Sequence, residues 1–148
     1  MIATGAAAGI AGSLVMTAIR AGGRPVGLGA DTPPRQIERN LEARTGLAPV
    51  TGPREEAAFT LALHLLAGAT FGALYGAMRA IARPGGALAG PLYGAAVYAF
   101  TLAGAGPALR LMRPLPDQRP TFMARELITH LAFGTVVAAL VERGRRPR

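Results

Sequence analysis

Four stretches without a fixed charge dominate this chain of 148 residues and limit what it can fold into. They cover residues 2–19, 57–78, 86–109 and 127–141. At about 1.5 Å per helical residue, the first three are about 27 to 36 Å long, which is enough to cross a hydrocarbon core of about 30 Å. The fourth reaches only about 22 Å, and it becomes sufficient if its helix begins near Thr121, with Arg125 and Glu126 paired or snorkelling at the interface. The sequence therefore predicts transmembrane helices at about 2–20, 57–79, 86–109 and 122–142.

The apolar residues of this chain are small rather than bulky. Alanine and glycine dominate them, with 20 glycines and no tryptophan. A water-soluble core relies on large side chains because these bury the area that drives folding, whereas helices in lipid associate where small residues let their backbones approach. In each predicted span small residues recur four positions apart, so they share one helix face. The glycines expected to pack the helices are Gly5, Gly9, Gly68, Gly72, Gly76, Gly90, Gly94 and Gly134.

An internal similarity relates the two halves of the chain. Residues 64–68 and 130–134 both read His-Leu-x-x-Gly, while residues 5–9 and 86–90 both read Gly-Ala-x-Ala-Gly. Because two crossings separate the copies, they would insert in the same orientation, with both histidines toward the same membrane face. The predicted fold is thus all-α: a single membrane domain over 1–148, a four-transmembrane-helix bundle made of two similar helical hairpins.

The long connection between the first two spans contains one further helical pattern. Pro33 suits the first position of a helix, and Ile37 and Leu41 lie one turn apart, opposite charged residues. Gly46 is suited to ending the helix. The pattern predicts a short amphipathic helix over about 33–45 that lies on the membrane surface.

The charge of the chain narrows its possible partners. Its formal net charge is +8, and all sixteen basic residues are arginines. These arginines lie between the apolar runs, with no aromatic residues among them, which argues against nucleic acid as a partner. The chain has no cysteine, and it contains no phosphate-binding GKS or GKT, no GxSxG and no HExxH. Nothing marks the sole serine, Ser13, as an activated nucleophile, so we expect neither an enzyme nor a bound cofactor.

Several segments together resemble a known family. They are GAAAGIAGSLVMTAI, PPRQIERNLEARTG, HLLAGATFGALYGAMR, RPLPDQRP and ELITHLAFGTVVAAL. In this order they are similar to the uncharacterised YagU-like inner-membrane proteins of bacteria, over most of the chain. The resemblance implies a multi-pass protein of the bacterial inner (cytoplasmic) membrane. It supplies no known activity and no catalytic residues.

The residues with the greatest chemical potential are the two histidines and one glutamate. His64 and His130 each begin a stripe of small residues, so both should face the bundle interior, and Glu126 lies one turn before His130. The three could simply hydrogen-bond neighbouring helices, which favours a structural or accessory protein with the lipid bilayer as its partner. They could instead handle protons or a polar solute in a small homo-oligomeric pathway. As a third alternative, the histidines could bind haem or another metal, although two ligands alone cannot close a zinc site.

Overall fold

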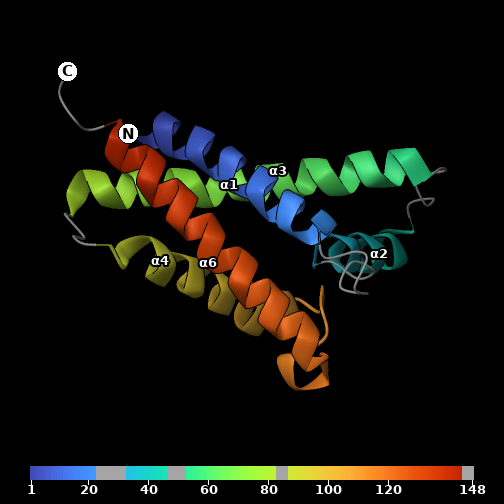
Figure 1. Cartoon of the computed structure of the whole chain (residues 1–148). Helices are drawn as coiled ribbons and strands as arrows, with labels where there is room; N and C mark the ends of the chain where they lie inside the picture. The colour runs from blue at the N-terminus through green and yellow to red at the C-terminus, as the bar shows by residue number, and fades with distance from the viewer. Residues whose placement is uncertain (23–32, 47–52, 83–86, 145–148) are drawn as a thin grey trace.

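The computed structural model describes residues 1–22, 33–46, 53–82 and 87–144, and its regular structure there is all helical, as predicted (Figure 1). Within this described part, five helices have ten residues or more: α1 (Ile2–Gly22), α2 (Pro33–Thr45), α3 (Pro53–Ile81), α4 (Ala89–Tyr98) and α6 (Pro120–Arg143). Three of them, α1, α3 and α6, are long and apolar enough to span a membrane. The chain is therefore all-α, with three candidate membrane-spanning helices.

The third predicted span, 86–109, is helical from residue 89 to residue 108, but it is not a uniform α-helix; residue 86 lies outside the described residues. After α4 the chain continues as a π-helix, η2 (Ala99–Ala105), and a last turn, α5 (Gly106–Ala108). The N–H of Gly106 bonds to the carbonyl of Thr101, five residues back. Pro107 follows directly, and its ring would clash with the carbonyl four residues earlier in a regular α-helix. The wider turn of the π-helix relieves this clash. The apolar pattern of the sequence did not predict this π-helix.

The two helical hairpins close on their glycines. At the crossing of α1 and α3, Gly5 and Gly9 lie against Gly68, Gly72 and Gly76. A Cβ atom added to Gly9 would overlap the carbonyl oxygen of Gly68, and one added to Gly72 would overlap that of Gly5. Only hydrogen fits at these positions, so the two backbones touch directly, as the spacing of small residues suggests.

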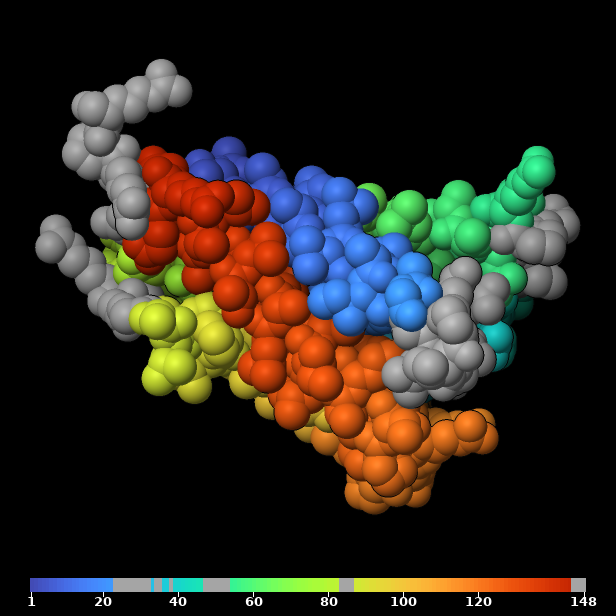
Figure 2. All heavy atoms as spheres, viewed as in Figure 1, coloured from blue at the N-terminus to red at the C-terminus, as the bar shows by residue number. Residues whose placement is uncertain are grey.

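The second crossing, between α4 and α6, follows the same rule. A Cβ atom on Gly94 would overlap the carbonyl oxygen of His130, and one on Gly90 would lie 2.9 Å from the carbonyl oxygen of Gly134. In addition, α1 packs against α6 and so joins the two hairpins. Figure 2 shows α6 running diagonally across one face, with α1 along one side and α4 along the other.

The amphipathic helix predicted over 33–45 forms as α2, which ends where Gly46 adopts a φ of +65°. One part of its apolar face packs against the rest of the protein, and another part is exposed. Ile37 packs against a small core of Leu102, Met112 and Phe122, whereas Leu41 is exposed. This packing fixes α2 beside the end of α6 at which the candidate site lies.

Many large apolar side chains point outward from the long helices. An outer surface this apolar is unusual for a protein in water and is normal for one in lipid. The exposed residues include Ile10, Leu14, Leu66, Leu74, Leu92, Phe100 and Ile128.

Candidate functional site

A buried ion pair links the two hairpins at the C-terminal end of α1. The guanidinium of Arg20, in the last turn of α1, meets the carboxylate of Glu126 in α6, with Nη2 2.5 Å from Oε2 and Nε 3.4 Å from Oε1. Glu126 has no exposed surface, and Arg20 retains only 8%. The parallel contacts form a bidentate, charge-assisted pair, the strongest kind of side-chain hydrogen bonding.

The same carboxylate also receives a second guanidinium. Arg125 places both Nε and Nη2 3.0 Å from Oε1 of Glu126. Its guanidinium carbon lies 5.2 Å from the centre of the Phe122 ring, a cation–π distance. One negative charge is therefore shared between two positive groups. Both oxygens of Glu126 are occupied by N–H donors.

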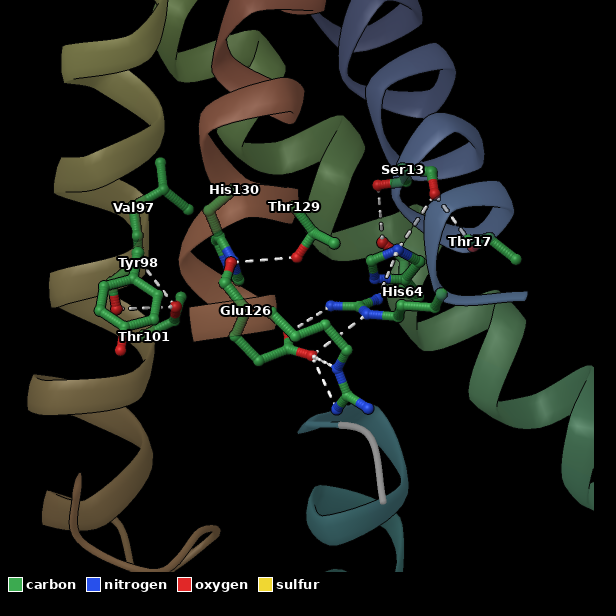
Figure 3. Close-up of polar contacts among 11 residues, drawn as sticks. Ser13, Thr17, His64, Val97, Tyr98, Thr101, Glu126, Thr129 and His130 are labelled. Carbon is green, nitrogen blue, oxygen red and sulfur yellow. Dashed lines mark hydrogen bonds and ion pairs between the residues drawn. The ribbon is translucent and has the colours of Figure 1, made fainter. Parts of the chain in front are cut away.

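His64 connects this ion pair to the α1–α3 crossing. Its Nε2 lies 3.2 Å from the carbonyl oxygen of Ser13 and 3.4 Å from Nη1 of Arg20, and the hydroxyl of Ser13 donates to the carbonyl of His64 at 3.3 Å. Figure 3 shows His64 of α3 beside Ser13 of α1, with the Glu126 side chain extending toward them from α6. A carbonyl can only accept, so the ring donates to Ser13 when Nε2 carries the proton. Without that proton, Nε2 can accept from Arg20 instead.

His130 is held in a defined orientation on α6. Its Nδ1 lies 2.6 Å from the carbonyl oxygen of Glu126, one turn earlier. Since that oxygen only accepts, Nδ1 carries a proton, and in the neutral form of the ring Nε2 is then an acceptor. The ring edge meets Tyr98 with the centroids 5.6 Å apart. Only 7% of His130 is exposed, so packing and the hydrogen bond together fix its ring.

A cavity of about 450 Å³ lies beside this polar cluster. His64, His130 and Arg20 line one part of it, and the remaining lining is largely apolar. Glu126 is not among the lining residues. The apolar walls come from α3, with Leu63, Ala67 and Phe71, from η2 and its flanks, with Val97, Leu102, Ala105 and Leu109, and from Met16, Ile37, Met112 and Phe133.

A second ion pair joins the hairpins at the opposite end of α6. Arg79, in the last turn of α3, pairs with Glu142 near the end of α6. The Arg79 side chain is buried, but 45% of the Glu142 side chain is exposed. This pair therefore lies at the edge of the helix bundle, unlike the enclosed cluster around Glu126.

The structure brings the three residues singled out from the sequence to one end of the bundle, but their surroundings differ. His64 and His130 reach the cavity, while the carboxylate of Glu126 is turned into the ion pair. Sequence reasoning did not single out Arg20, the last residue of the first predicted span, or the contacts of Ser13, whose hydroxyl and carbonyl both contact His64. The signal for Arg20 was available: it ends one apolar helix at the side where Glu126 begins another.

In the described segments, no group of three or more histidine, cysteine, aspartate or glutamate side chains is placed to hold a metal ion. In comparisons with known proteins, no family, no curated protein and no solved structure matches the chain. The similarity to YagU-like proteins therefore depends on the sequence patterns alone.

Proposed function

We propose that this protein is a four-span, multi-pass protein of the bacterial inner membrane with a structural or accessory role and no enzymatic activity. In this proposal the helical run from residue 89 to residue 108 also spans the membrane, because its 20 residues are about 30 Å long. With α1, α3 and α6, it completes two hairpins of the predicted kind.

One observation carries this proposal: the ion pairs that join the hairpins lie at both ends of α6. Glu126 and Glu142 are 16 residues apart, or about 24 Å along the helix. That separation falls just short of the hydrocarbon core of about 30 Å, so the charges would lie near the two interfaces. Charges inside a membrane are costly unless they are paired, and here the pairs also hold the hairpins together.

The alternative of a proton or solute pathway depends on the two histidines that line the cavity. Against it, both oxygens of Glu126 accept N–H groups from arginine, and the residue does not line the cavity. A carboxylate held in this way stabilises the bundle rather than passing a proton on. A flux in proteoliposomes that disappears in His130→Ala, while the fold persists, would restore the pathway. A stoichiometric metal in the purified protein would restore the haem or metal alternative.

Membrane topology tests the proposal directly. The chain has no cysteine, so single cysteines can be introduced at the exposed positions Ala43, Ala82 and Asp117 and labelled from one side of inverted or right-side-out vesicles. Four spans require that positions 43 and 117 label from the same side and position 82 from the other. Release of the protein by alkaline carbonate, or labelling of all three positions from one side, would refute the proposal.

A further inference from the structure

The lining of the cavity includes residues that are exposed at the outside of the bundle, Leu66 on α3 and Leu109 just after α5. Leu63 and Ala67 of α3 form one wall, and Leu102 and Ala105 of η2 form the other. Toward the middle of the bundle the cavity closes at Phe71, whose ring meets Phe100 edge to face and whose carbonyl accepts a hydrogen bond from Tyr93. In a bilayer, a cavity of this kind lies within reach of the surrounding lipid chains.

The η2 wall is itself unusual. π-Helical turns are rare, and they occur frequently at functional sites. Here the π-helix contributes Thr101, Leu102 and Ala105 to the lining of the cavity. Thr101 turns its hydroxyl back to the carbonyl of Val97 at 2.7 Å, so this residue adds little polarity to the wall.

The polar end of the cavity suits an anion. Its ionisable side chains, within the described lining, are Arg20, His64 and His130, and none is acidic. Arg20 uses its Nε–Nη2 edge for Glu126, whose charge it shares with Arg125. The Nη1–Nη2 edge does not face Glu126, and its Nη1 has only the long 3.4 Å contact with Nε2 of His64 described above. Arginine recognises carboxylate and phosphate oxygens through an edge of this kind.

The cavity has a polar end and an apolar end, as a lipid molecule has. Arg20 lies in the last turn of α1, near one interface in the proposed topology. From His64 to Phe71 the lining follows α3 for seven residues, or about 10 Å, away from the Arg20 end of the bundle. An occupant would therefore have its charge at interfacial depth and its apolar part pointing inward, which is the arrangement of a phospholipid in the surrounding leaflet.

We propose that this cavity binds one anionic phospholipid, with its phosphate at Arg20 and His64 and an acyl chain between α3 and η2. The proposal depends on the membrane insertion proposed above. The surrounding bilayer supplies this occupant at high concentration, already oriented. His130 Nε2, an acceptor, would bind a hydroxyl of the head group or of the glycerol.

A matched pair of variants on η2 tests the proposal. Ala105 lines the cavity, whereas Ala103, two residues earlier, is exposed and does not. Ala105→Phe fills the acyl-chain path and leaves the ion pair untouched, and Ala103→Phe adds the same ring outside the cavity. Each protein is reconstituted in vesicles of equal phosphatidylglycerol and phosphatidylcholine, exchanged into lipid-free detergent, and analysed by native mass spectrometry for retained lipid.

We expect the unmodified protein and Ala103→Phe to retain about one phosphatidylglycerol per chain, and Ala105→Phe to retain at least tenfold less. The double variant Arg20→Gln/Glu126→Gln should lose the preference for phosphatidylglycerol over phosphatidylcholine. Equal retention in the two phenylalanine variants, or equal retention of both lipids by the unmodified protein, would overturn the inference. A protein that resists carbonate extraction but retains no lipid overturns this inference alone, whereas a protein released by carbonate overturns the proposed function too.

Discussion

The cluster around Glu126 makes an asymmetric prediction about stability. Glu126→Gln removes the one carboxylate that two buried guanidinium groups share, while Arg20→Gln leaves Glu126 still bound to Arg125. Glu126→Gln preserves the shape of the side chain, and Arg20→Gln retains a polar amide on a shorter side chain. The glutamate variant should therefore lose more stability than the arginine variant, although each breaks the same Arg20–Glu126 contact.

The burial of the groups sets the magnitudes. Glu126 is fully buried, and removing one partner of a buried ion pair costs about 3–5 kcal/mol because a charge is left uncompensated. Arg20→Gln should cost about 1.5–3 kcal/mol, the range for a hydrogen bond to a charged group. The double variant leaves neither charge of the pair behind, so its loss should fall short of the sum by about 0.5–3 kcal/mol. As a comparison, Glu142→Gln breaks a pair whose carboxylate is reached by water but whose guanidinium is buried, so its loss should lie between that of an exposed pair and that of Glu126→Gln.

Equilibrium unfolding of the purified protein measures these differences. Titration of mixed micelles with sodium dodecyl sulfate, followed by far-ultraviolet circular dichroism, suits a chain without tryptophan. The reasoning fails if Arg20→Gln destabilises the protein as much as Glu126→Gln does, because the second guanidinium on Glu126 would then contribute nothing. It also fails if the two single losses simply add in the double variant.

Two further matched pairs test the packing by the same measurement. Gly94→Ala would drive a methyl group into a main-chain oxygen of α6 and should cost about 1–3 kcal/mol or more, whereas Gly104→Ala, whose nearest neighbouring atom is 3.6 Å away, should cost nothing or stabilise; equal effects would argue against the α4–α6 crossing. Tyr93→Phe loses a 2.5 Å hydrogen bond to a carbonyl of α3 and should cost about 1 kcal/mol. Tyr75→Phe should be neutral or stabilising, since the buried Tyr75 hydroxyl has no hydrogen-bond partner within the described residues, and a larger loss there than at Tyr93 would contradict that account.

Much of the fold could be predicted because one physical requirement dominates it. Helices that associate through backbone contact need small residues on one face, and a four-residue spacing of glycine is visible in the sequence. The observed helices extend slightly beyond the predicted spans: α3 begins at Pro53 rather than 57, and α6 at Pro120 rather than 122. The residues added to α3 include Arg54, Glu55 and Glu56, whose charges excluded them from the apolar stretch, whereas α6 gains only Pro120 and Thr121 at its N-terminal end.

The π-helix and the cavity could not be predicted from the sequence patterns. A π-turn needs no residue type of its own, and Pro107 alone is equally compatible with a simple kink. The cavity arises because α1 packs on α3 and α6, while η2 faces α3 with space between them. Such a gap depends on the angles at which the pairs cross, and these follow from the contacts of all four helices together rather than from any one segment.

The position of Arg20, by contrast, follows from a second row of buried residues on α1, which contains only one glycine. On α1 the residues Gly5, Gly9 and Ser13 face α3, and the buried residues Ala8, Gly12, Met16 and Arg20 recur at the same four-residue spacing one step around the helix. This second row meets α6: a Cβ atom on Gly12 would lie 2.7 Å from the ring of Phe133, and Arg20 meets Glu126.

Between these two contacts the residue number rises by eight along α1, from Gly12 to Arg20, and falls by seven along α6, from Phe133 to Glu126. The two helices are therefore antiparallel and in register over two turns. A row of small and flexible residues that ends in a single cation therefore predicts where that cation goes. It must lie opposite the anion at the matching depth of the antiparallel helix. In this protein that anion is Glu126, which makes the contact between the hairpins specific in register as well as in surface shape.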